Sequence, residues 1–231
     1  TRVVAAVVAE PTELRIIRAH KGLVRATFRV QGKAAHSSIP HLGANAIMGA
    51  ARLIAAFDDD LSSEFIGRED GITGMPTHNV GTIQGGLQVN FVPDDCHFEL
   101  DRRVLPSEQF DTVLTPYRKI AEKVAGDYEG ISISVHEDLS IEAMETPADA
   151  PIVTCAVGAV ESVTGHAFVG GEPYGTDASK ISAADIPSIV LGPGSIDQAH
   201  AAVEWIEVDQ VLRAVDIYHR VMMDADVYSS I

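Results

Sequence analysis

The sequence predicts an α/β fold in which one α+β domain is inserted into a domain built on a parallel sheet. The chain opens on a continuous apolar run at residues 3–9, which is typical of a strand buried on both faces of such a sheet. Between about residues 23 and 137 the strands instead alternate apolar and polar side chains, as half-exposed antiparallel strands do. Buried-strand and helix patterns return from about Pro147 to the end of the chain.

The inserted segment should contain, in chain order, a strand at 23–30, a helix at 43–57, a loop at 58–76, strands at 78–83 and 95–104, a helix at 108–125 and a strand at 131–135. Apolar residues at helical spacing predict the first helix. Ser107 is a candidate N-cap of the second helix, and Pro116 inside that helix predicts a kink or a later start. This order of strands and helices is that of the split β-α-β, ferredoxin-like unit.

The remaining segments predict α/β sheet structure, with helices at 151–164, 176–184 and 208–228 and strands at 167–170 and 186–191. The simplest architecture therefore places residues 1–21 and 139–231 in one α/β domain, with residues 22–138 as the inserted domain. The opening strand needs a neighbour on each side, and no residue of the sequence precedes it. We therefore expect the chain to be cut at its N-terminus.

Charge and cysteine content exclude several classes of protein. The 33 acidic against 17 basic residues give a net charge of −16, which argues against nucleic acid and anionic membrane surfaces as partners. Cys96 and Cys155 lie far apart without ligand spacing, so neither a disulfide scaffold nor a thiolate zinc site is expected, and a reducing cytoplasm is the default compartment. No apolar run reaches the roughly 18 residues that a membrane span needs.

A glycine- and proline-rich segment at residues 192–200 follows the apolar strand predicted at 186–191. Ligands of α/β sheets collect at the ends of strands, and glycines allow a sharp turn while Pro193 stiffens it. His200 at the end of this segment is a candidate metal ligand. A lone histidine is more often structural or exposed, so both interpretations stay open on this segment alone.

Eight short motifs follow one another along the chain: VAEPT (8–12), RAHKG (18–22), GKAAHSS (32–38), THNVG (77–81), GG (85–86), NFVP (90–93), DRR (101–103) and GPGSIDQAH (192–200). Together they resemble the M20 metallopeptidase/deacylase family, and within it the acetylornithine deacetylase branch, over nearly all of the chain. The resemblance implies a zinc-binding, zinc-peptidase-like α/β domain interrupted by a ferredoxin-like lid that also forms a homodimer.

The resemblance also implies the roles of single residues. Glu10 matches the carboxylate that binds one of two zinc ions, for which cobalt could substitute, and His200 matches the imidazole that binds the other. His36 matches the lid histidine that reaches the partner subunit's active site and polarises the scissile carbonyl, and the adjacent Ser37 and Ser38 could anchor it.

Polar positions of the lid lie near the substrate in this family, and Asn79, Asn90 and Arg103 match them. A guanidinium such as that of Arg103 suits bidentate binding of a carboxylate. Arg102 should point to the opposite strand face and leave the substrate untouched. The turn at residues 175–176, Gly175 and Thr176, matches the place where the backbone of the pocket approaches the substrate.

The implied function is a metal-dependent amidohydrolase that removes an acyl group from an N-acyl amino acid, as in arginine biosynthesis. The stretch YGTD at 174–177 is closer to the desuccinylase branch, so a succinyl-diaminopimelate desuccinylase and an M20 carboxypeptidase or aminoacylase remain alternatives. The family's remaining metal ligands and its glutamate general base lie N-terminal to the match of Glu10. This chain does not supply them, so an inactive, dimerising fragment is the rival interpretation.

Overall fold

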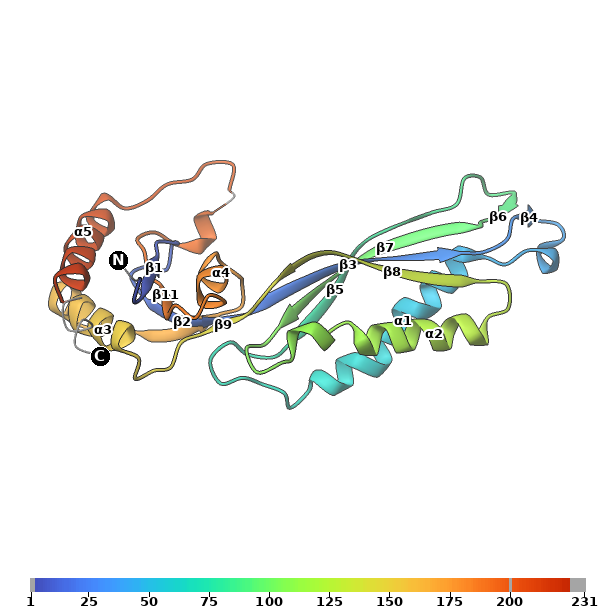
Figure 1. Ribbon diagram of the computed structural model, residues 1–231. Coiled ribbons are helices and arrows are strands. Elements are labelled where there is room, and N and C mark those ends of the chain that lie inside the picture. Colours follow the sequence, from blue (N-terminus) through green and yellow to red (C-terminus); the bar gives the residue numbers. More distant parts are fainter. Residues whose placement is uncertain (1–2, 200, 225–231) are drawn as a thin grey trace. The chain divides into compact units, whose positions relative to one another are not determined.

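The computed structural model describes residues 3–199 and 201–224, and its elements mix helices with strands as predicted (Figure 1). The chain divides into two compact units. Unit 1 takes in the described parts of Thr1–Gly22, Gly71–Thr73 and Ile141–Ile231, and unit 2 consists of Leu23–Asp70 and Gly74–Ser140. Within the described residues, no helix is long and apolar enough to cross a membrane.

Unit 1 is built on a mixed sheet, whose strands lie in the order β1 (Ala6–Val8), β11 (Ser188–Val190), β2 (Ile16–His20) and β10 (Val169–Glu172), with β9 (Met144–Glu145) also paired to β2. β1 runs parallel to β11 and β10 parallel to β2, while β11 and β2 are antiparallel. Among the described residues β1 pairs with β11 alone, and its residues are only half-buried. The predicted burial on both faces is therefore wrong for this strand as the structure describes it.

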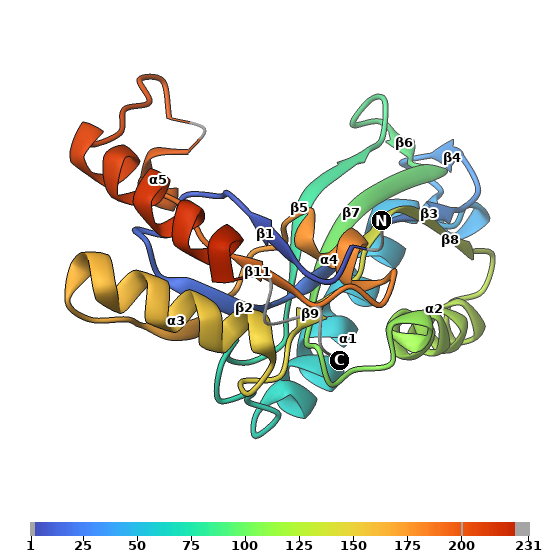
Figure 2. The same ribbon diagram turned by 60° about the vertical axis from the view of Figure 1, so that its left-hand side comes forward.

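Helices cover the two faces of this sheet unequally (Figure 2). α3 (Pro151–Thr164) and α5 (Val208–Met223) share a core with Ile16 and Ile189 on one face. The short α4 (Ala178–Ser182) packs on the other face, in a smaller cluster that contains Ile17. Because successive strand residues point to opposite faces, Ile16 and Ile17 serve different clusters.

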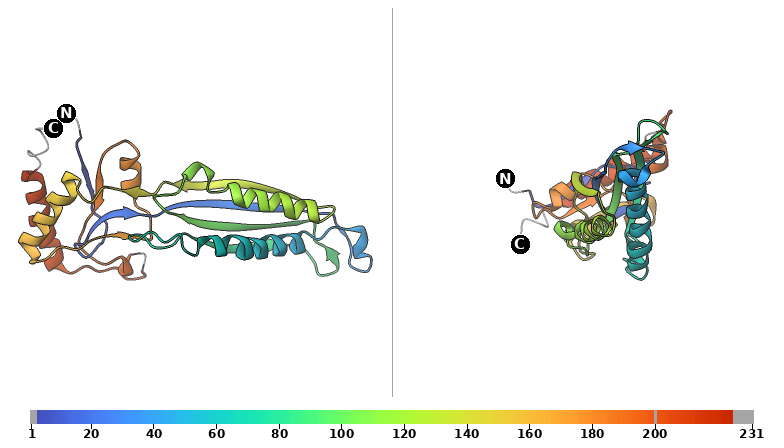
Figure 3. Two further views of the ribbon diagram at one scale, coloured as in Figure 1. Left: turned by 90° about the horizontal axis from the view of Figure 1, so that it is seen from below. Right: turned by 90° about the vertical axis from the view of Figure 1, so that its right-hand side faces the viewer.

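Unit 2 is a sheet whose strands lie in the order β5 (Thr77–Gly85), β7 (Asp95–Val104), β3 (Gly22–Gln31) and β8 (Ser132–Ile141). The helices α1 (Ala46–Phe65) and α2 (Thr115–Asp127) lie together on one face of this sheet (Figures 1 and 3). The short strands β4 (Ala35–His36) and β6 (Phe91–Val92) pair separately. Three single-turn 3-10 helices complete the described elements: η1 (Pro40–Leu42), η2 (Phe110–Thr112) and η3 (Ile196–Gln198).

An aromatic cluster fills the core of unit 2 between the sheet and its helices. Phe28 of β3 and Phe98 of β7 stack with their centroids 5.1 Å apart, and Phe57 of α1 meets Phe28 edge-on at 5.0 Å. Tyr117 of α2 packs edge-on against Phe57 at 5.0 Å. Aromatic pairs in these geometries add stability beyond the apolar area that they bury.

Both helices of unit 2 differ from the predicted bounds, α1 most at its C-terminal end and α2 most at its start. α1 begins after Asn45, whose side chain accepts a hydrogen bond from the Met48 N–H, and it continues to Phe65 through the region predicted as a loop. Leu61 and Phe65 extend its buried stripe. α2 begins at Thr115 with Pro116 in its first turn, where a missing N–H costs nothing. The later start is confirmed, and Ser107 does not cap this helix.

Candidate functional site

Glu10 lies at the carboxyl end of β1, and the loop that begins at Gly192 lies at the carboxyl end of β11. Because β1 and β11 are parallel neighbours, both loops leave the sheet at the same edge. Among described residues the carboxylate of Glu10 has no ion pair, and its residue is partly exposed. The sheet therefore presents, beside the glycine-rich loop, a carboxylate that has no ion pair among the described residues.

Thr12 fastens these two loops together. Its fully buried hydroxyl donates to the Arg15 carbonyl at 2.7 Å and accepts from the Gly192 N–H at 3.1 Å. The Thr12 N–H donates to the Gly192 carbonyl at 3.2 Å. A Cβ at Gly192 would lie only 2.4 Å from the Glu10 carbonyl oxygen, so the close approach of the two loops requires glycine at this position.

The turn after Thr12 contains two non-glycine residues in the left-handed region, Glu13 with φ 55° and Leu14 with φ 62°. Each such residue costs on the order of 1–3 kcal/mol and persists only when its surroundings hold it. Here the Glu13 N–H donates to the Gly194 carbonyl at 2.7 Å, and the Leu14 N–H donates to the Gly192 carbonyl at 3.0 Å. Strain of this kind is common at functional sites.

The second predicted metal ligand, His200, lies outside the described residues. Among residues 3–199 and 201–224, no group of three histidine, cysteine, aspartate or glutamate side chains is placed to hold a metal ion. Glu10 on its own fits a metal site, because a carboxylate oxygen is a ligand that zinc accepts and this one has no ion pair within residues 3–199 and 201–224. Its role as a ligand stays a prediction.

A polar cluster near the Glu10 turn consists of Arg15, Glu172 and Tyr174. Arg15 pairs with the buried Glu172 of β10, with 2.7 Å between Nη2 and Oε1. The Tyr174 hydroxyl is buried and has no hydrogen-bond partner among the described residues. Burial raises the pKa of Tyr174 to about 12, aided by the negative charges of Glu172 and Glu10 and opposed by Arg15. The hydroxyl therefore stays protonated at neutral pH. Sequence reasoning did not single out this cluster.

The turn predicted to approach the substrate follows β10. A Cβ at Gly175 would lie 3.2 Å from the Lys21 carbonyl oxygen, so the turn packs closely on the end of β2. The Thr176 hydroxyl accepts from the Ala178 N–H at 3.2 Å and so connects this turn to the first residue of α4. Ser179 is buried and donates to the Thr176 carbonyl at 3.0 Å, which makes it a structural residue. A substrate contact of this turn remains a prediction.

In unit 2 the β4–β6 pair brings His36 and Asn90 together, since the Ser37 N–H donates to the Asn90 carbonyl at 3.0 Å. Ser38 anchors the exposed imidazole, with its hydroxyl 2.8 Å from Nδ1 and its backbone N–H donating to Nδ1 at 3.2 Å. The expected anchor is thus confirmed for Ser38. Because Nδ1 accepts this N–H, the neutral ring carries its proton on Nε2. His36 therefore presents a hydrogen-bond donor at its outer end.

Asn79 and Arg103 lie on the open face of the unit 2 sheet. Asn79 on β5 is opposite Asp101 on β7, and Arg103 is two residues along the same strand. Asp101 holds the Arg103 guanidinium, with 2.7 Å between Nε and Oδ1. The four candidate residues of unit 2 thus form two groups, one on the β4–β6 pair and one on the sheet face.

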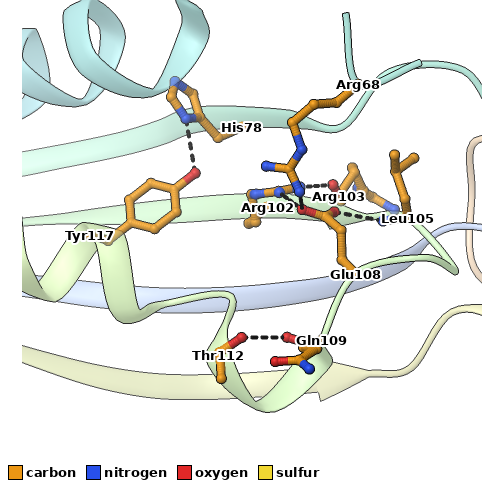
Figure 4. A network of polar contacts seen from close by, with 9 residues as sticks. All are labelled: Arg68, His78, Arg102, Arg103, Leu105, Glu108, Gln109, Thr112 and Tyr117. Atoms are coloured by element: carbon orange, nitrogen blue, oxygen red, sulfur yellow. Dashed lines mark hydrogen bonds and ion pairs between the residues drawn. The ribbon is translucent and has the colours of Figure 1, made fainter. Parts of the chain in front are cut away.

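Arg102 points to the opposite, helix-covered face, as the alternation predicts (Figure 4). It is not a passive neighbour, however, since its side chain is only 3% exposed and its Nη2 lies 2.6 Å from Glu108 Oε1. Arg68 shares this oxygen at 2.8 Å, and the Arg102 guanidinium stacks over Phe65 at 4.5 Å. A charged group buried here needs its partner, so Arg102 is a structural residue of unit 2, and the expectation that it leaves the substrate untouched stays a prediction.

Comparison with known proteins agrees with this architecture. Residues 18–129 match the family described as the peptidase dimerisation domain, M20_dimer. The chain is 30% identical over 223 residues to the acetylornithine deacetylase of Myxococcus xanthus. The alignment covers 93% of this chain and 56% of that protein. The chain thus spans a little over half the length of the curated relatives that it matches.

Solved structures share the fold. The aminopeptidase PepT of Bacillus cereus superposes with a TM-score of 0.79 at 22% identity, over 96% of this chain and 57% of that one. A dinuclear metal binding peptidase of the M20 family from Bacillus subtilis superposes with a TM-score of 0.67 at 17% identity, over 94% of this chain and 56% of that one. Residues 18–129 match the M20 peptidase dimerisation domain, and the resemblance of the whole chain to the M20 family is confirmed.

Proposed function

We propose that this chain is part of a metal-dependent amidohydrolase that removes an acyl group from an N-acyl amino acid, with N-acetylornithine as the first substrate to test. The observation that carries the proposal is the Glu10 turn, which is strained, hydrogen-bonded to the Gly192 loop and located at the carboxyl ends of two parallel strands. The similarity to acetylornithine deacetylases supports the choice of substrate.

Glu10 would hold one metal ion and His200 a second. Two bound zinc or cobalt ions would supply an activated water and stabilise charge on the acyl oxygen. The further ligands and the general base would come from a segment that the longer relatives contain and this chain does not align with. The carboxylate of Glu10, which has no ion pair among the described residues, supports its part of this assignment.

His36 would act on the acyl carbonyl of a substrate bound by the partner subunit of a homodimer. Its Nε2–H is the outward donor, because Ser38 occupies Nδ1. A donor aimed at the position of a developing oxyanion stabilises the transition state of amide hydrolysis. The peptidase dimerisation domain supports the homodimer on which action across subunits depends.

Arg103 and Asn79 would bind the α-carboxylate of the amino acid. Asp101 orients the Arg103 guanidinium through Nε, and the side chain is 29% exposed on the open sheet face. Its remaining N–H groups face no acceptor among the described residues other than Asp101. A planar fork of donors matches the two oxygens of a carboxylate.

Two other interpretations lead to different outcomes of one substrate screen. A desuccinylase would prefer N-succinyl over N-acetyl amino acids, and a carboxypeptidase would prefer dipeptides. The full-length protein should be assayed with zinc and with cobalt against all three sets. If the protein hydrolyses no substrate of the three sets, the proposed function is contradicted. That outcome would favour the interpretation of the chain as an inactive, dimerising fragment.

Replacing His36 by Ala in the full-length protein should lower kcat by roughly 10²–10³ with unchanged zinc content, because one oxyanion donor contributes about this much. Ser63→Ala on the exposed side of α1 is a control that should leave kcat unchanged. Loss of zinc in the His36 variant would instead make it a metal ligand.

Action across the dimer can be tested by mixing subunits. Neither the His36→Ala homodimer nor a Glu10→Ala homodimer should be active, but a mixed dimer contains one site with both residues intact. We expect mixing to restore up to half of the activity per mixed dimer. Equal inactivity of well-mixed heterodimers would contradict action of His36 on the partner subunit's substrate.

A further inference from the structure

Arg15 contacts two segments of the candidate site at once, the turn at Thr12 and the end of strand β10. Its Nε donates to the Thr12 carbonyl at 3.2 Å, and its Nη2 donates to Glu172 Oε1 at 2.7 Å. Its backbone N–H also donates to the Thr12 carbonyl at 2.9 Å. Thr12 and Glu172 are far apart in the sequence, so the guanidinium connects segments that no local turn joins.

Burial distinguishes this contact from an ordinary surface ion pair. The Glu172 side chain is only 11% exposed, while that of Arg15 is 35% exposed and packs over the ring of Phe168 at 5.6 Å. A carboxylate taken out of water needs a charged or hydrogen-bonding partner. Arg15 supplies it through one arm of its fork and uses Nε for the Thr12 carbonyl, a geometry that a lysine cannot reproduce.

The two segments that Arg15 joins are those of the candidate site. Thr12 lies two residues after Glu10 and is hydrogen-bonded to Gly192, and the strained Glu13 and Leu14 lie between Thr12 and Arg15. Glu172 lies two residues before Tyr174, whose hydroxyl is buried without a partner among the described residues. A contact at Arg15 therefore fixes the end of the strained turn relative to the end of β10.

We propose that Arg15 is a positioning residue of this site: through Thr12 it fixes the turn that presents Glu10, and through Glu172 it fixes the turn at residues 174–176. The proposal rests on the proposed function, in which Glu10 binds metal and the turn approaches the substrate. Residues that orient metal ligands typically change metal affinity by about 10–100-fold when replaced.

Arg18, which lies on β2 three residues after Arg15, offers a control. Its Nη1 contacts Glu145 Oε1 at 3.0 Å and the Thr146 carbonyl at 2.9 Å, so it also joins an ion pair to a backbone acceptor. This contact links β2 to the segment of β9, away from the Glu10 turn. Arg15→Lys and Arg18→Lys both keep the charge, but only Arg15→Lys removes contacts that two separate nitrogens, Nε and Nη2, make at once.

The test uses the full-length protein. Zinc affinity is measured by competition with a chromophoric chelator, alongside melting temperature, kcat and KM. We expect Arg15→Lys to weaken zinc binding about tenfold or more and to raise KM, while Arg18→Lys changes both less than twofold. The pair Arg15→Gln with Glu172→Gln removes both charges together, so it should recover melting temperature but retain the weakened zinc binding.

Equal changes of zinc affinity in the two lysine variants, or a loss of melting temperature alone, would overturn the proposal and make Arg15 a purely structural residue. Full zinc affinity in the double glutamine variant would overturn it as well. A wild-type protein that binds zinc but hydrolyses no N-acyl amino acid contradicts the proposed function, while the zinc measurement still decides the role of Arg15. A wild-type protein that binds no zinc overturns both.

Discussion

Asp101 holds two guanidinium groups on the open face of the unit 2 sheet. Arg103 approaches its Oδ1 at 2.7 Å and Arg25 approaches its Oδ2 at 3.0 Å, both through Nε. The two arginines thus share one carboxylate but lie on different strands, β7 and β3. Only Arg103 lies on β7, the strand that pairs with β5 and its Asn79, so the two positions separate a substrate contact from a general effect of charge.

Replacing Arg103 by Lys should raise KM for N-acyl amino acids about tenfold or more in the full-length protein. A lysine keeps the charge but presents a point donor where a carboxylate matches a planar fork. Steady-state kinetics of Arg25→Lys give the control, for which we expect less than a twofold change. Similar values of KM in both variants would show that Arg103 does not bind the carboxylate.

Residue roles could be predicted only where local sequence decides them. Alternation along β7 placed Arg102 and Arg103 on opposite faces, because side chains of a strand alternate. It could not reveal that Glu108 turns back to meet Arg102, since that contact depends on the path of the loop after Leu105. The Arg15–Glu172 pair could not be predicted from the sequence either, because its members are 157 residues apart and meet only through the path of the chain.

At the scale of elements, His78 of β5 joins both helices of unit 2. Its Nδ1 lies 2.9 Å from the Tyr117 hydroxyl of α2, and its Nε2 lies 3.4 Å from the Ser62 hydroxyl of α1. Burial lowers the pKa of His78, and the positive charge of Arg102 lowers it further, while Asp58 opposes this. The folded unit therefore favours the neutral imidazole.

Acidification should destabilise unit 2 through His78. The unfolded chain takes up this proton near the ordinary histidine pKa of about 6.5, whereas the folded chain takes it up at lower pH. Between these two values the unfolded state binds more protons, so the contribution to stability is complete above about pH 6.5 and is lost as pH falls through the folded pKa.

Two measurements check this. An NMR titration should give His78 a pKa below 6.5. Denaturant unfolding, followed by signals of α1 and α2, should have its midpoint at a lower denaturant concentration at pH 5 than at pH 7.5. The variant His78→Gln should have a smaller pH dependence of that midpoint. A His78 pKa at or above 6.5, or equal pH dependence in both proteins, would contradict the prediction.

Element types were predictable where a periodic pattern is long, and element ends were not. The helix at 151–164 agrees with α3 because apolar residues and Pro151 mark its course. The sequence predicts that α1 ends near Phe57, because residues 58–76 are polar and contain several glycines, and this region begins with the aspartates at 58–60. In the structure they occupy the exposed side of the same helix, while Leu61 and Phe65 continue its buried stripe. Tertiary packing, which single-sequence patterns do not contain, decides such ends.

At the scale of the molecule, α5 carries two apolar stripes. One stripe, with Ala214, Ile217 and Val221, is buried against α3 and the sheet of unit 1. The other is exposed, with Leu212 at 62% and Val215 at 59% relative exposure, and it also includes Val208, Val211 and Met222. A contiguous exposed apolar patch commonly marks an interaction surface.

The 231-residue chain should therefore associate beyond a dimer as its concentration rises. The double variant Leu212→Glu with Val215→Glu should suppress this association, because it places two charges on the exposed stripe and leaves the buried stripe intact. Sedimentation velocity across a concentration series is the measurement. Ile66→Glu, at the exposed end of α1, is the control and should associate like the parent chain. Equal association of all three would exclude the α5 stripe as its cause.

Metal binding should distinguish this chain from the longer proteins that it resembles. A catalytic zinc ion usually has three protein ligands, and among the described residues only Glu10 is proposed as one, with His200 proposed outside them. One ligand for each of two ions leaves most coordination positions to water. The 231-residue chain alone should therefore bind zinc weakly, with a dissociation constant several orders of magnitude above that of the full-length protein.

Chelator competition and isothermal titration calorimetry, applied to the isolated chain and to the full-length protein, measure this difference in zinc affinity directly. Glu10→Gln should abolish the tight sites of the full-length protein and change the weak binding of the isolated chain very little, because the lost ligand matters only in a completed coordination shell. The exposed Glu13, in the same turn, gives the control variant Glu13→Gln. Tight binding of two zinc ions by the isolated chain would contradict the assignment, because these 231 residues would then contain a full set of ligands.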